Sequence, residues 1–321
     1  MSGCNGRWFD DPGRAGSTRA SPPGRVDGSP PFSAEVAVTQ LKPFYQQVQA
    51  HYDLSNDFFA LFLDPSMTYS CAYFDPPDLT LEQAQRAKID LALGKCDLKP
   101  GQRLLDIGCG WGSTIRRAVE GYGVRAVGLT LSERQAALAR ERLADLGHRI
   151  EVRLQGWEEF DEPVDRIVSI GAFEHFREER YTAFFAKCHR LLPADGRMLL
   201  HSIVKPSLEE INAKGLEITH EDVLFNKFIL KAIFPGGQLR PVATVRQYAE
   251  AAGFRVTRVH PLSTNYARTL EAWATNLQSA RDRAVALTSE EIYETYMRYL
   301  TGCARYFRSG HLDVVQFTCC K

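Results

Sequence analysis

Short apolar runs alternate along most of the chain with longer stretches in which an apolar residue recurs every three or four positions. The short runs predict strands near residues 103–107, 124–129, 150–154, 165–170, 196–203, 255–262 and 313–320. The longer stretches predict helices within 36–63 and near 81–96, 112–121, 132–147, 178–192, 244–252, 269–287 and 289–307. This alternation is typical of an α/β fold, a largely parallel sheet with helices on both faces. The last strand follows a short turn at Ser309-Gly310, so we expect it to lie antiparallel at one edge of the sheet.

Two segments depart from the alternating pattern. Residues 1–33 are rich in Gly, Pro, Ser and Arg and have almost no periodic apolar residues, so we expect a disordered extension before a domain at 34–321. Residues of about 205–243 form an insertion that is too long for an ordinary connection and contains Phe225, Ile229 and Phe234. Such an insertion suits a helical lid over an apolar substrate, and it equally suits a packing excursion that only thickens the core.

The charge balance gives no sign of an electrostatic partner. The chain has 39 basic and 39 acidic residues, so nucleic acid or an anionic membrane would need a local patch. It has no apolar run of roughly 18 residues and no apolar segment of a secretory signal, so we expect it in the cytoplasm. Its eight cysteines include no C-x-x-C pair and no His/Cys grouping with zinc spacing, which predicts reduced thiols and no metal site.

The most informative stretch is residues 104–112, Leu-Leu-Asp-Ile-Gly-Cys-Gly-Trp-Gly, where an apolar strand runs into a turn with glycine at every second position. Glycine lacks the Cβ that would keep a ligand from the backbone, and the helix that follows directs its first amides at the loop. The spacing differs from the dinucleotide pattern G-x-G-x-x-G, and the next strand ends at Thr130, where a dehydrogenase would carry Asp or Glu. The loop therefore favours S-adenosylmethionine over NAD.

Motifs of one family run through the globular part of the chain. Besides the glycine loop they are residues 51–55 (His-Tyr-Asp-Leu-Ser), 69–74 (Tyr-Ser-Cys-Ala-Tyr-Phe), 128–132 (Gly-Leu-Thr-Leu-Ser), 156–158 (Gly-Trp-Glu), 171–176 (Gly-Ala-Phe-Glu-His-Phe) and 299–303 (Tyr-Leu-Thr-Gly-Cys). Through them, residues 36–321 resemble the mycolic acid cyclopropane synthases, within the wider cyclopropane-fatty-acid synthase family of S-adenosylmethionine-dependent methyltransferases. The resemblance implies a Rossmann-like, seven-stranded class I methyltransferase sheet with a helical lid insertion. The chain lacks the additional N-terminal domain of enzymes that act on intact phospholipids, which favours the mycolic branch.

The resemblance also implies where S-adenosylmethionine binds. Loop amides would meet its carboxylate, Gln135 its ribose hydroxyls, and the Trp157 indole its adenine. The full set of residues that the family pattern assigns to the cofactor is Tyr69, Ser70, Gly108, Cys109, Gly110, Thr130, Leu131, Ser132, Glu133, Arg134, Gln135, Trp157 and Glu158.

For catalysis the resemblance implies a bound bicarbonate that acts as a base. The matching positions are Cys71, Ile170, Glu174, His201, Tyr266 and Cys303. Aromatic rings can stabilise a substrate cation without trapping it, a role that we assign to Phe173, Tyr266 and Tyr69. Taken singly, each position also has an ordinary structural interpretation, since His201 in an apolar strand is usually a satisfied core residue and buried cysteines are usually packing residues.

The implied enzyme transfers a methyl group to a double bond of a long, mycolic-type acyl chain carried by an acyl carrier protein, and closes a cyclopropane ring through a carbocation. Relatives with almost the same motifs let water capture the cation and form a methyl-branched alcohol, and this alternative stays open. A non-catalytic lipid-binding protein on the same fold is disfavoured by the retained loop and by Glu174, His201 and Tyr266. An ordinary small-molecule methyltransferase is disfavoured by the apolar insertion. We expect no nucleic-acid partner, and a transient contact with a membrane surface is left open.

Overall fold

A computed structural model of the chain describes residues 41–44 and 54–321. The predicted disorder of residues 1–33 lies outside the described residues, as does most of the helical segment predicted within 36–63. The described part of that segment contains one short helix, α3 (Asn56–Ala60), whose N-cap Ser55 accepts a hydrogen bond from the Phe58 amide.

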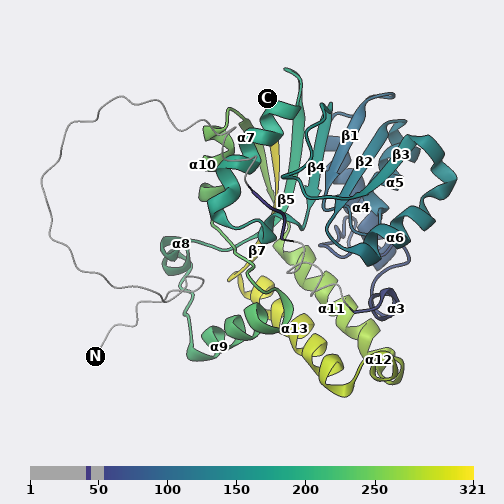
Figure 1. The fold of residues 1–321 in the computed structure, drawn as a ribbon. Coiled ribbons are helices and arrows are strands. Elements are labelled where there is room, and N and C mark those ends of the chain that lie inside the picture. Colours follow the sequence, from purple (N-terminus) through teal and green to yellow (C-terminus); the bar gives the residue numbers. More distant parts are fainter. Residues whose placement is uncertain (1–40, 45–53) are drawn as a thin grey trace, which may run out of the picture.

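Seven strands form one sheet in the order β3-β2-β1-β4-β5-β7-β6 (Figure 1). Their bounds lie within one or two residues of the predicted ranges: β1 (Arg103–Ile107), β2 (Arg125–Thr130), β3 (Ile150–Leu154), β4 (Arg166–Ile170), β5 (Arg197–Val204), β6 (Arg255–Pro261) and β7 (Asp313–Cys320). Neighbours from β3 to β5 run parallel, and β7 is antiparallel to both of its neighbours, β5 and β6.

The last strand is antiparallel, as predicted, but its predicted place at an edge of the sheet is wrong. Strand β7 pairs with β5 on one side and β6 on the other, so β6 forms the edge. The burial of the two strands explains this order. Residues 314–319 are buried without interruption, whereas β6 exposes residues along most of its length. A strand buried on both faces belongs inside a sheet, and a polar strand tolerates an edge.

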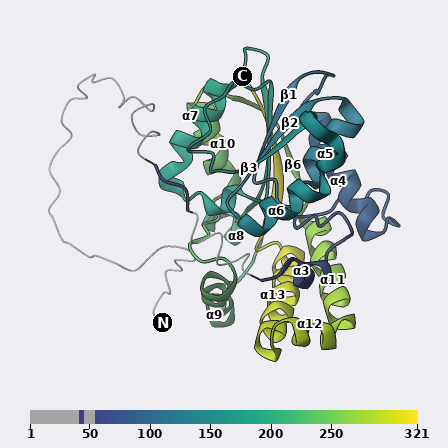
Figure 2. The same cartoon turned by 45° about the vertical axis from the view of Figure 1, so that its right-hand side comes forward.

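Helices cover both faces of the sheet, as predicted (Figure 2). One face carries α4 (Leu81–Lys95), α5 (Ser113–Tyr122) and α6 (Glu133–Arg142), and the other carries α7 (Tyr181–Leu191) and α10 (Val242–Ala251). Short 3-10 turns complete these layers: η1 (Ala144–Arg149), η2 (Phe173–His175) and η3 (Glu178–Arg180). The predicted helix at 132–147 is therefore two elements, α6 and η1, which meet at Leu143, where the backbone leaves the helical region.

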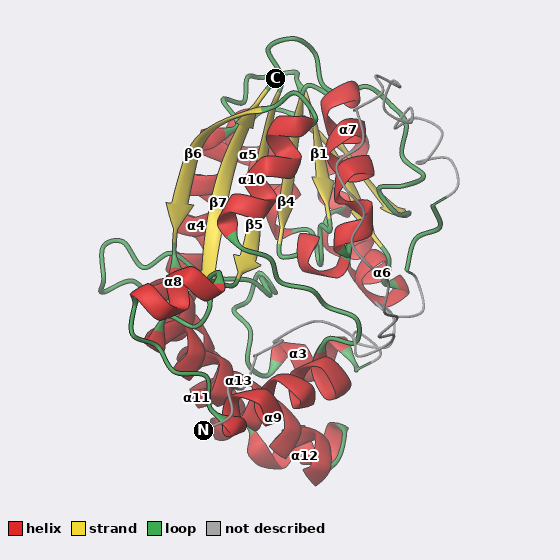
Figure 3. Ribbon diagram, turned by 90° about the vertical axis from the view of Figure 1, so that its left-hand side faces the viewer, coloured by secondary structure: helices red, strands yellow, loops and turns green. Residues whose placement is uncertain are grey.

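A third, helical layer lies beneath the carboxyl ends of the parallel strands (Figure 3). It contains α3 together with α11 (Ser263–Ser279), α12 (Arg281–Leu287) and α13 (Glu290–Ser309). The predicted helix at 269–287 is wrong in two respects, because α11 begins at Ser263 and the chain bends at Ala280 before α12. The bend returns α12 against α13 and α3, so tertiary packing overrides the continuous helical pattern.

The insertion at residues 205–243 folds as α8 (Leu208–Ala213), α9 (His220–Phe228) and a π-helical turn, η4 (Ile229–Ile233). Helix α9 is attached to α13 by the Phe225 ring, which stacks on Tyr306 with centroids 4.9 Å apart. The Tyr306 hydroxyl also donates to Asp222 Oδ1 at 2.5 Å. Among residues 41–44 and 54–321, no helix is both long and apolar enough to cross a lipid bilayer.

Candidate active site

Two cavities open at the carboxyl edge of the parallel strands and share one wall. The first, the loop cavity, lies against the glycine loop and encloses about 900 Å³ including its opening to solvent. The second, the apolar cavity, lies between the sheet edge, α11, α13 and the insertion, and encloses about 1140 Å³ including its opening. Both cavities are lined by Tyr69, Ser70, Gly171 and His175, which we call the shared wall.

The structure brings most of the predicted cofactor residues together around the loop cavity. Those that line it are Tyr69, Ser70, Gly108, Cys109, Gly110, Thr130, Leu131, Gln135 and Trp157. The other four do not line it. Ser132 caps α6 by accepting a hydrogen bond from the Gln135 amide, Glu133 and Arg134 are exposed on α6, and Glu158 pairs with Arg180 at 2.7 Å.

The three loop positions 108, 110 and 112 require glycine for different structural reasons. A Cβ on Gly108 would lie 2.5 Å from the Ala172 Cβ, and one on Gly112 would lie 2.6 Å from Leu143 Cδ1, so protein packing excludes side chains at both positions. A Cβ on Gly110 would meet no atom of the described residues within 4 Å, although its φ of +54° is also in the left-handed region. Gly110 is thus the glycine whose missing side chain leaves room for a ligand.

The loop amides are also not equivalent. Those of Gly108 and Cys109 both donate to the Leu129 carbonyl at 2.9 Å, which ties the loop to the end of β2. The predicted contact between loop amides and a ligand carboxylate therefore does not extend to these two. Gln135 is held in place as well, because its Oε1 accepts a hydrogen bond from the Thr130 hydroxyl at 2.8 Å.

Two charged residues that sequence reasoning did not select, Lys88 and Asp106, also line the loop cavity. Lys88 Nζ donates to Ser70 Oγ at 2.6 Å, and Gln85 donates to the Ser70 carbonyl at 2.8 Å, so α4 fixes the shared wall. Burial lowers the pKa of Lys88 to about 8 and raises that of Asp106 to about 7. Two features of the sequence could have indicated these residues: an acid inside the apolar run Leu-Leu-Asp-Ile, and a lysine on the buried face of a helix.

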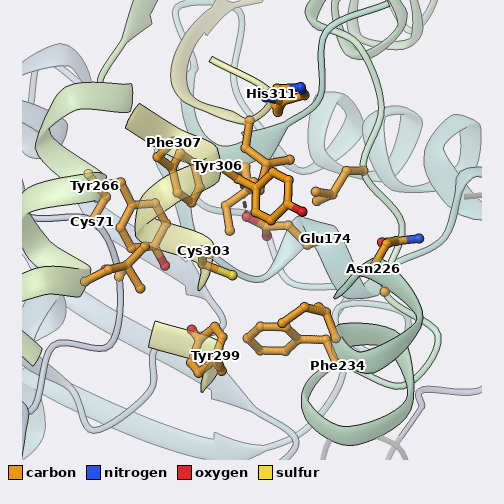
Figure 4. Close-up of a pocket in the computed structure, with 18 of the residues that line it drawn as sticks. Cys71, Glu174, Asn226, Phe234, Tyr266, Tyr299, Cys303, Tyr306, Phe307 and His311 are labelled. Carbon is orange, nitrogen blue, oxygen red and sulfur yellow. Dashed lines mark hydrogen bonds between the residues drawn. The ribbon is translucent and has the colours of Figure 1, made fainter. Parts of the chain in front are cut away.

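Five of the six predicted catalytic residues line the apolar cavity. Figure 4 shows Cys71, Glu174, Tyr266 and Cys303 around it, and His201 lines it from β5. The sixth, Ile170, lines the loop cavity on the other side of the shared wall.

The prediction that the Phe173 ring stabilises a cation is wrong. Phe173 lines neither cavity and stacks on Tyr181 with centroids 4.2 Å apart, inside the core between the sheet and α7. The short turn η2 directs Phe173 into that core and the next residue, Glu174, into the cavity. Tyr69 and Tyr266 do line the apolar cavity, and the Tyr69 hydroxyl lies 3.4 Å from that of Tyr299.

Glu174 and His201 each have one side-chain polar atom with a hydrogen-bond partner and one without a partner among the described residues. Glu174 Oε1 accepts a hydrogen bond from the Ile203 amide at 2.6 Å, while its buried Oε2 has no hydrogen-bond partner among the described residues. His201 Nδ1 lies 3.2 Å from Gln316 Nε2, while its buried Nε2 has no partner among them either. A buried polar atom without a partner costs stability unless a ligand supplies one, so this pair points to a small polar ligand in the apolar cavity.

Burial also decides which groups are charged. It raises the pKa of Glu174 to about 7 and lowers that of His201 far below its ordinary value. It raises the pKa of Cys303 to about 12 and that of Cys71 well above its usual range, and Cys71 donates to the Ala72 carbonyl at 3.1 Å. The imidazole and both thiols are therefore neutral near pH 7, so neither cysteine is an activated nucleophile. No group of three or more His, Cys, Asp or Glu residues suited to a metal ion occurs in the described ranges.

The raised pKa of Glu174 predicts a pH-dependent stability. A carboxyl whose pKa is higher in the folded state contributes stability that is fully present below its ordinary value of 4.5 and is lost as the pH rises through about 7. The full difference is on the order of 3 kcal/mol. Relative to wild type, Glu174→Gln should therefore gain about that much unfolding free energy between about pH 4.5 and pH 8. Urea unfolding of both proteins across this range checks it, and a pH-independent difference would contradict it.

The sequence and the fold are both similar to those of known proteins. The family model described as mycolic acid cyclopropane synthetase matches residues 39–317. Cyclopropane mycolic acid synthase 3 of Mycobacterium tuberculosis is 60% identical over 281 residues, which cover 87% of this chain and 98% of that protein. The structure of the cyclopropane synthase MmaA2 from Mycobacterium tuberculosis has a TM-score of 0.87 at 54% identity, over 88% of this chain and 100% of that one. The crystal structure of mycolic acid cyclopropane synthase CmaA1 complexed with SAH and CTAB has a TM-score of 0.85 at 58% identity, with the same coverage.

Proposed function

This chain belongs to the mycolic acid cyclopropane synthetase family of S-adenosylmethionine-dependent methyltransferases, and on that premise we propose that it methylates a double bond of a long, mycolic-type acyl chain and closes a cyclopropane ring. The observation that supports this most directly is the shared wall. The loop cavity and the apolar cavity meet at Tyr69, Ser70, Gly171 and His175, so a methyl donor and an alkene would face each other across them.

The chain's own residues fit S-adenosylmethionine in the loop cavity. Gly110 leaves open space at the backbone, Gln135 and Trp157 line the same cavity, and Asp106 offers a buried acceptor. When bound, this cofactor supplies an electrophilic methyl group. The alkene π electrons would form the new C–C bond to that methyl group while the bond from the methyl carbon to sulfur breaks. The sulfur would keep that electron pair, S-adenosylhomocysteine would be left, and the other alkene carbon would become a carbocation. Tyr69 and Tyr266 stabilise this charge through their ring faces, and the apolar lining keeps water away from it.

Ring closure then needs a base for one proton of the transferred methyl group. We propose that bicarbonate supplies this base. Glu174 Oε2 and His201 Nε2 are buried atoms that have no hydrogen-bond partner among the described residues, and both belong to side chains of the apolar cavity. A small oxyanion with one hydroxyl could bind both. The neutral phenol of Tyr266 adds a third polar group at that cavity. Loss of the proton leaves the C–H electron pair to close the second C–C bond of the ring.

We propose that the insertion serves as the lid of the substrate side. It contributes Phe225, Ile229, Leu230 and Phe234 to the lining of the apolar cavity, which a purely structural excursion would not need to do. An acyl chain delivered by an acyl carrier protein is the substrate that such a lid suits, and a transient membrane contact is a second route of delivery. The protein is proposed to act in the cytoplasm.

The lid proposal predicts a specific effect at Gly302. A Cβ on this residue of α13 would overlap the Phe225 ring, because the ring packs directly on the helix backbone. Gly302→Ala should therefore lower the unfolding free energy by about 1–3 kcal/mol and weaken turnover of the acyl substrate. Affinity for S-adenosylhomocysteine should be unchanged, since neither residue lines the loop cavity. Phe225→Leu in the same protein should restore part of the loss. Urea unfolding, cofactor titration and turnover assays check this, and full stability of Gly302→Ala would contradict it.

The experiment that tests the proposed function is incubation of the purified protein with S-adenosylmethionine and an unsaturated long acyl chain on an acyl carrier protein. Ring formation adds the mass of CH2 to the acyl chain, whereas capture of the cation by water adds CH2 plus H2O. A cyclopropane product supports the proposal, and a hydroxylated product would replace it with the alternative reaction. Binding of the acyl chain without any methyl transfer would point instead to a lipid-binding protein.

A further inference from the structure

A chain of hydrogen bonds connects His201 to a lysine behind the sheet. Lys95 Nζ, at the end of α4, lies 2.5 Å from Gln316 Oε1 and 2.9 Å from His260 Nδ1. Gln316, on β7, is completely buried, and its Nε2 lies 3.2 Å from His201 Nδ1 on the neighbouring strand β5. None of Lys95, Gln316 and His260 lines either cavity.

The position of the proton on the His201 ring follows from which of these groups can donate a hydrogen bond and which can accept one. An ammonium group only donates, so Gln316 must present its carbonyl oxygen to Lys95. The amide nitrogen of Gln316 then faces His201, and because an amide nitrogen only donates, Nδ1 must accept. A neutral imidazole with a lone pair on Nδ1 carries its proton on Nε2. Nε2 is the His201 atom that has no partner among the described residues.

We propose that Lys95 and Gln316 are positioning residues that hold His201 in its Nε2–H tautomer, so that the apolar cavity presents one N–H donor from His201 together with the carboxyl acceptor of Glu174. This inference rests on the proposed function for the identity of the anion that receives the N–H. The donor matches an oxyanion, whereas the other tautomer would present a lone pair and repel it. Gln316 is buried within β7 and Lys95 is half-buried at the end of α4, and this pair thereby receives a role that packing alone does not give it.

Gln316→Glu tests the inference with almost no change in shape. A carboxylate accepts from both Lys95 and His201, so the His201 proton should move from Nε2 to Nδ1. Long-range ¹H–¹⁵N spectra of ¹⁵N-histidine-labelled protein distinguish the two tautomers, and His201→Gln identifies the His201 signals. Wild type should show a protonated Nε2 and a bare Nδ1. Protonation of Nδ1 in wild type would overturn the inference, whether or not the protein methylates an acyl chain.

A matched control distinguishes the effect of the Gln316 amide from an effect of generally weaker packing of the edge strands. His260→Ala removes the other partner of Lys95 but leaves Gln316 in place, and it should keep the Nε2–H tautomer. If Gln316→Glu leaves the proton on Nε2 with Nδ1 bare, or if His260→Ala moves it equally, the amide does not set the tautomer and the inference fails.

The functional consequence has its own readout. Loss of one hydrogen bond to an anion should lower the yield of cyclopropane per methyl group transferred by on the order of 10-fold in Gln316→Glu. Affinity for S-adenosylhomocysteine should stay at the wild-type value, because Gln316 is outside the loop cavity. A shifted tautomer with an unchanged ring yield would overturn the positioning role while leaving the proposed methyl transfer intact. Absence of methyl transfer in wild type would instead contradict the proposed function, and the tautomer spectra would still test whether Lys95 and Gln316 set the His201 tautomer.

Discussion

Cyclopropane formation is expected to fall by on the order of 10²-fold or more when Glu174 is changed to Gln, the usual scale for losing a positioned acid or base function. The substitution keeps the size of the side chain, and its amide oxygen can still accept the hydrogen bond from the Ile203 amide that Glu174 Oε1 receives. It replaces Oε2, the buried acceptor that has no partner among the described residues, with a nitrogen that only donates. The base would then lose its anchor while the methyl donor keeps its own, because Glu174 does not line the loop cavity.

A product profile by mass spectrometry, a melting curve and a cofactor titration measure the three parts of this expectation. The stalled cation should be diverted in part to alcohol or to an alkene with a shifted double bond, so the ratio of products changes as well as their sum. Glu178→Gln is a suitable control. Its carboxylate pairs with Arg240 at 2.7 Å, close in sequence to Glu174 but outside both cavities, and its loss should leave the product ratio unchanged. An unchanged ring yield from a folded Glu174→Gln protein would remove Glu174 from the mechanism.

Gly110→Val is expected to abolish cofactor binding at concentrations that saturate the wild type. In the part of the chain that the structure describes, no atom lies within 4 Å of a Cβ at this position, so the valine side chain would occupy space inside the loop cavity instead of displacing the fold. Titration calorimetry with S-adenosylhomocysteine measures the loss. NAD should not bind wild type, since β2, the strand that follows the loop and its helix, ends at Thr130 and not at an acid.

Backbone strain must be separated from this steric effect, because Gly110 has a φ of +54°. Gly101 provides the control, since it has a φ of +84° and is exposed in a surface turn. An added Cβ there would likewise have no atom of residues 41–44 or 54–321 within 4 Å. Gly101→Val should cost a similar 1–3 kcal/mol or so of stability and leave binding intact. If both variants lose cofactor binding together, strain and not occupancy of the cavity is the cause.

Sequence reasoning found the loop, the cofactor class and most of the cavity residues for different reasons. The glycine loop is a local pattern, so its strand, turn and helix could be read directly from residues 104–122. The residues of the apolar cavity come from widely separated motifs, and only the family resemblance linked them. Phe173 shows what the family resemblance cannot predict. Its motif was identified correctly, but the direction of its ring depends on how a turn of three residues meets α7.

By itself, the sequence determined where the strands and most of the helices lie and that they build an α/β sheet, because local periodicity carries this information. The glycine loop and the family motifs are contiguous, so they too could be recognised from the sequence as those of a methyltransferase of this family. Only the tertiary structure decided the order of β7 and β6, the bend between α11 and α12, and the partners of buried polar groups. Lys95 and Gln316 are 221 positions apart, and Lys88 and Ser70 meet through packing of α4 against the shared wall. The physical reason is that periodicity tells which side of an element is buried, whereas the identity of the neighbour across that buried side is set by non-local pairing.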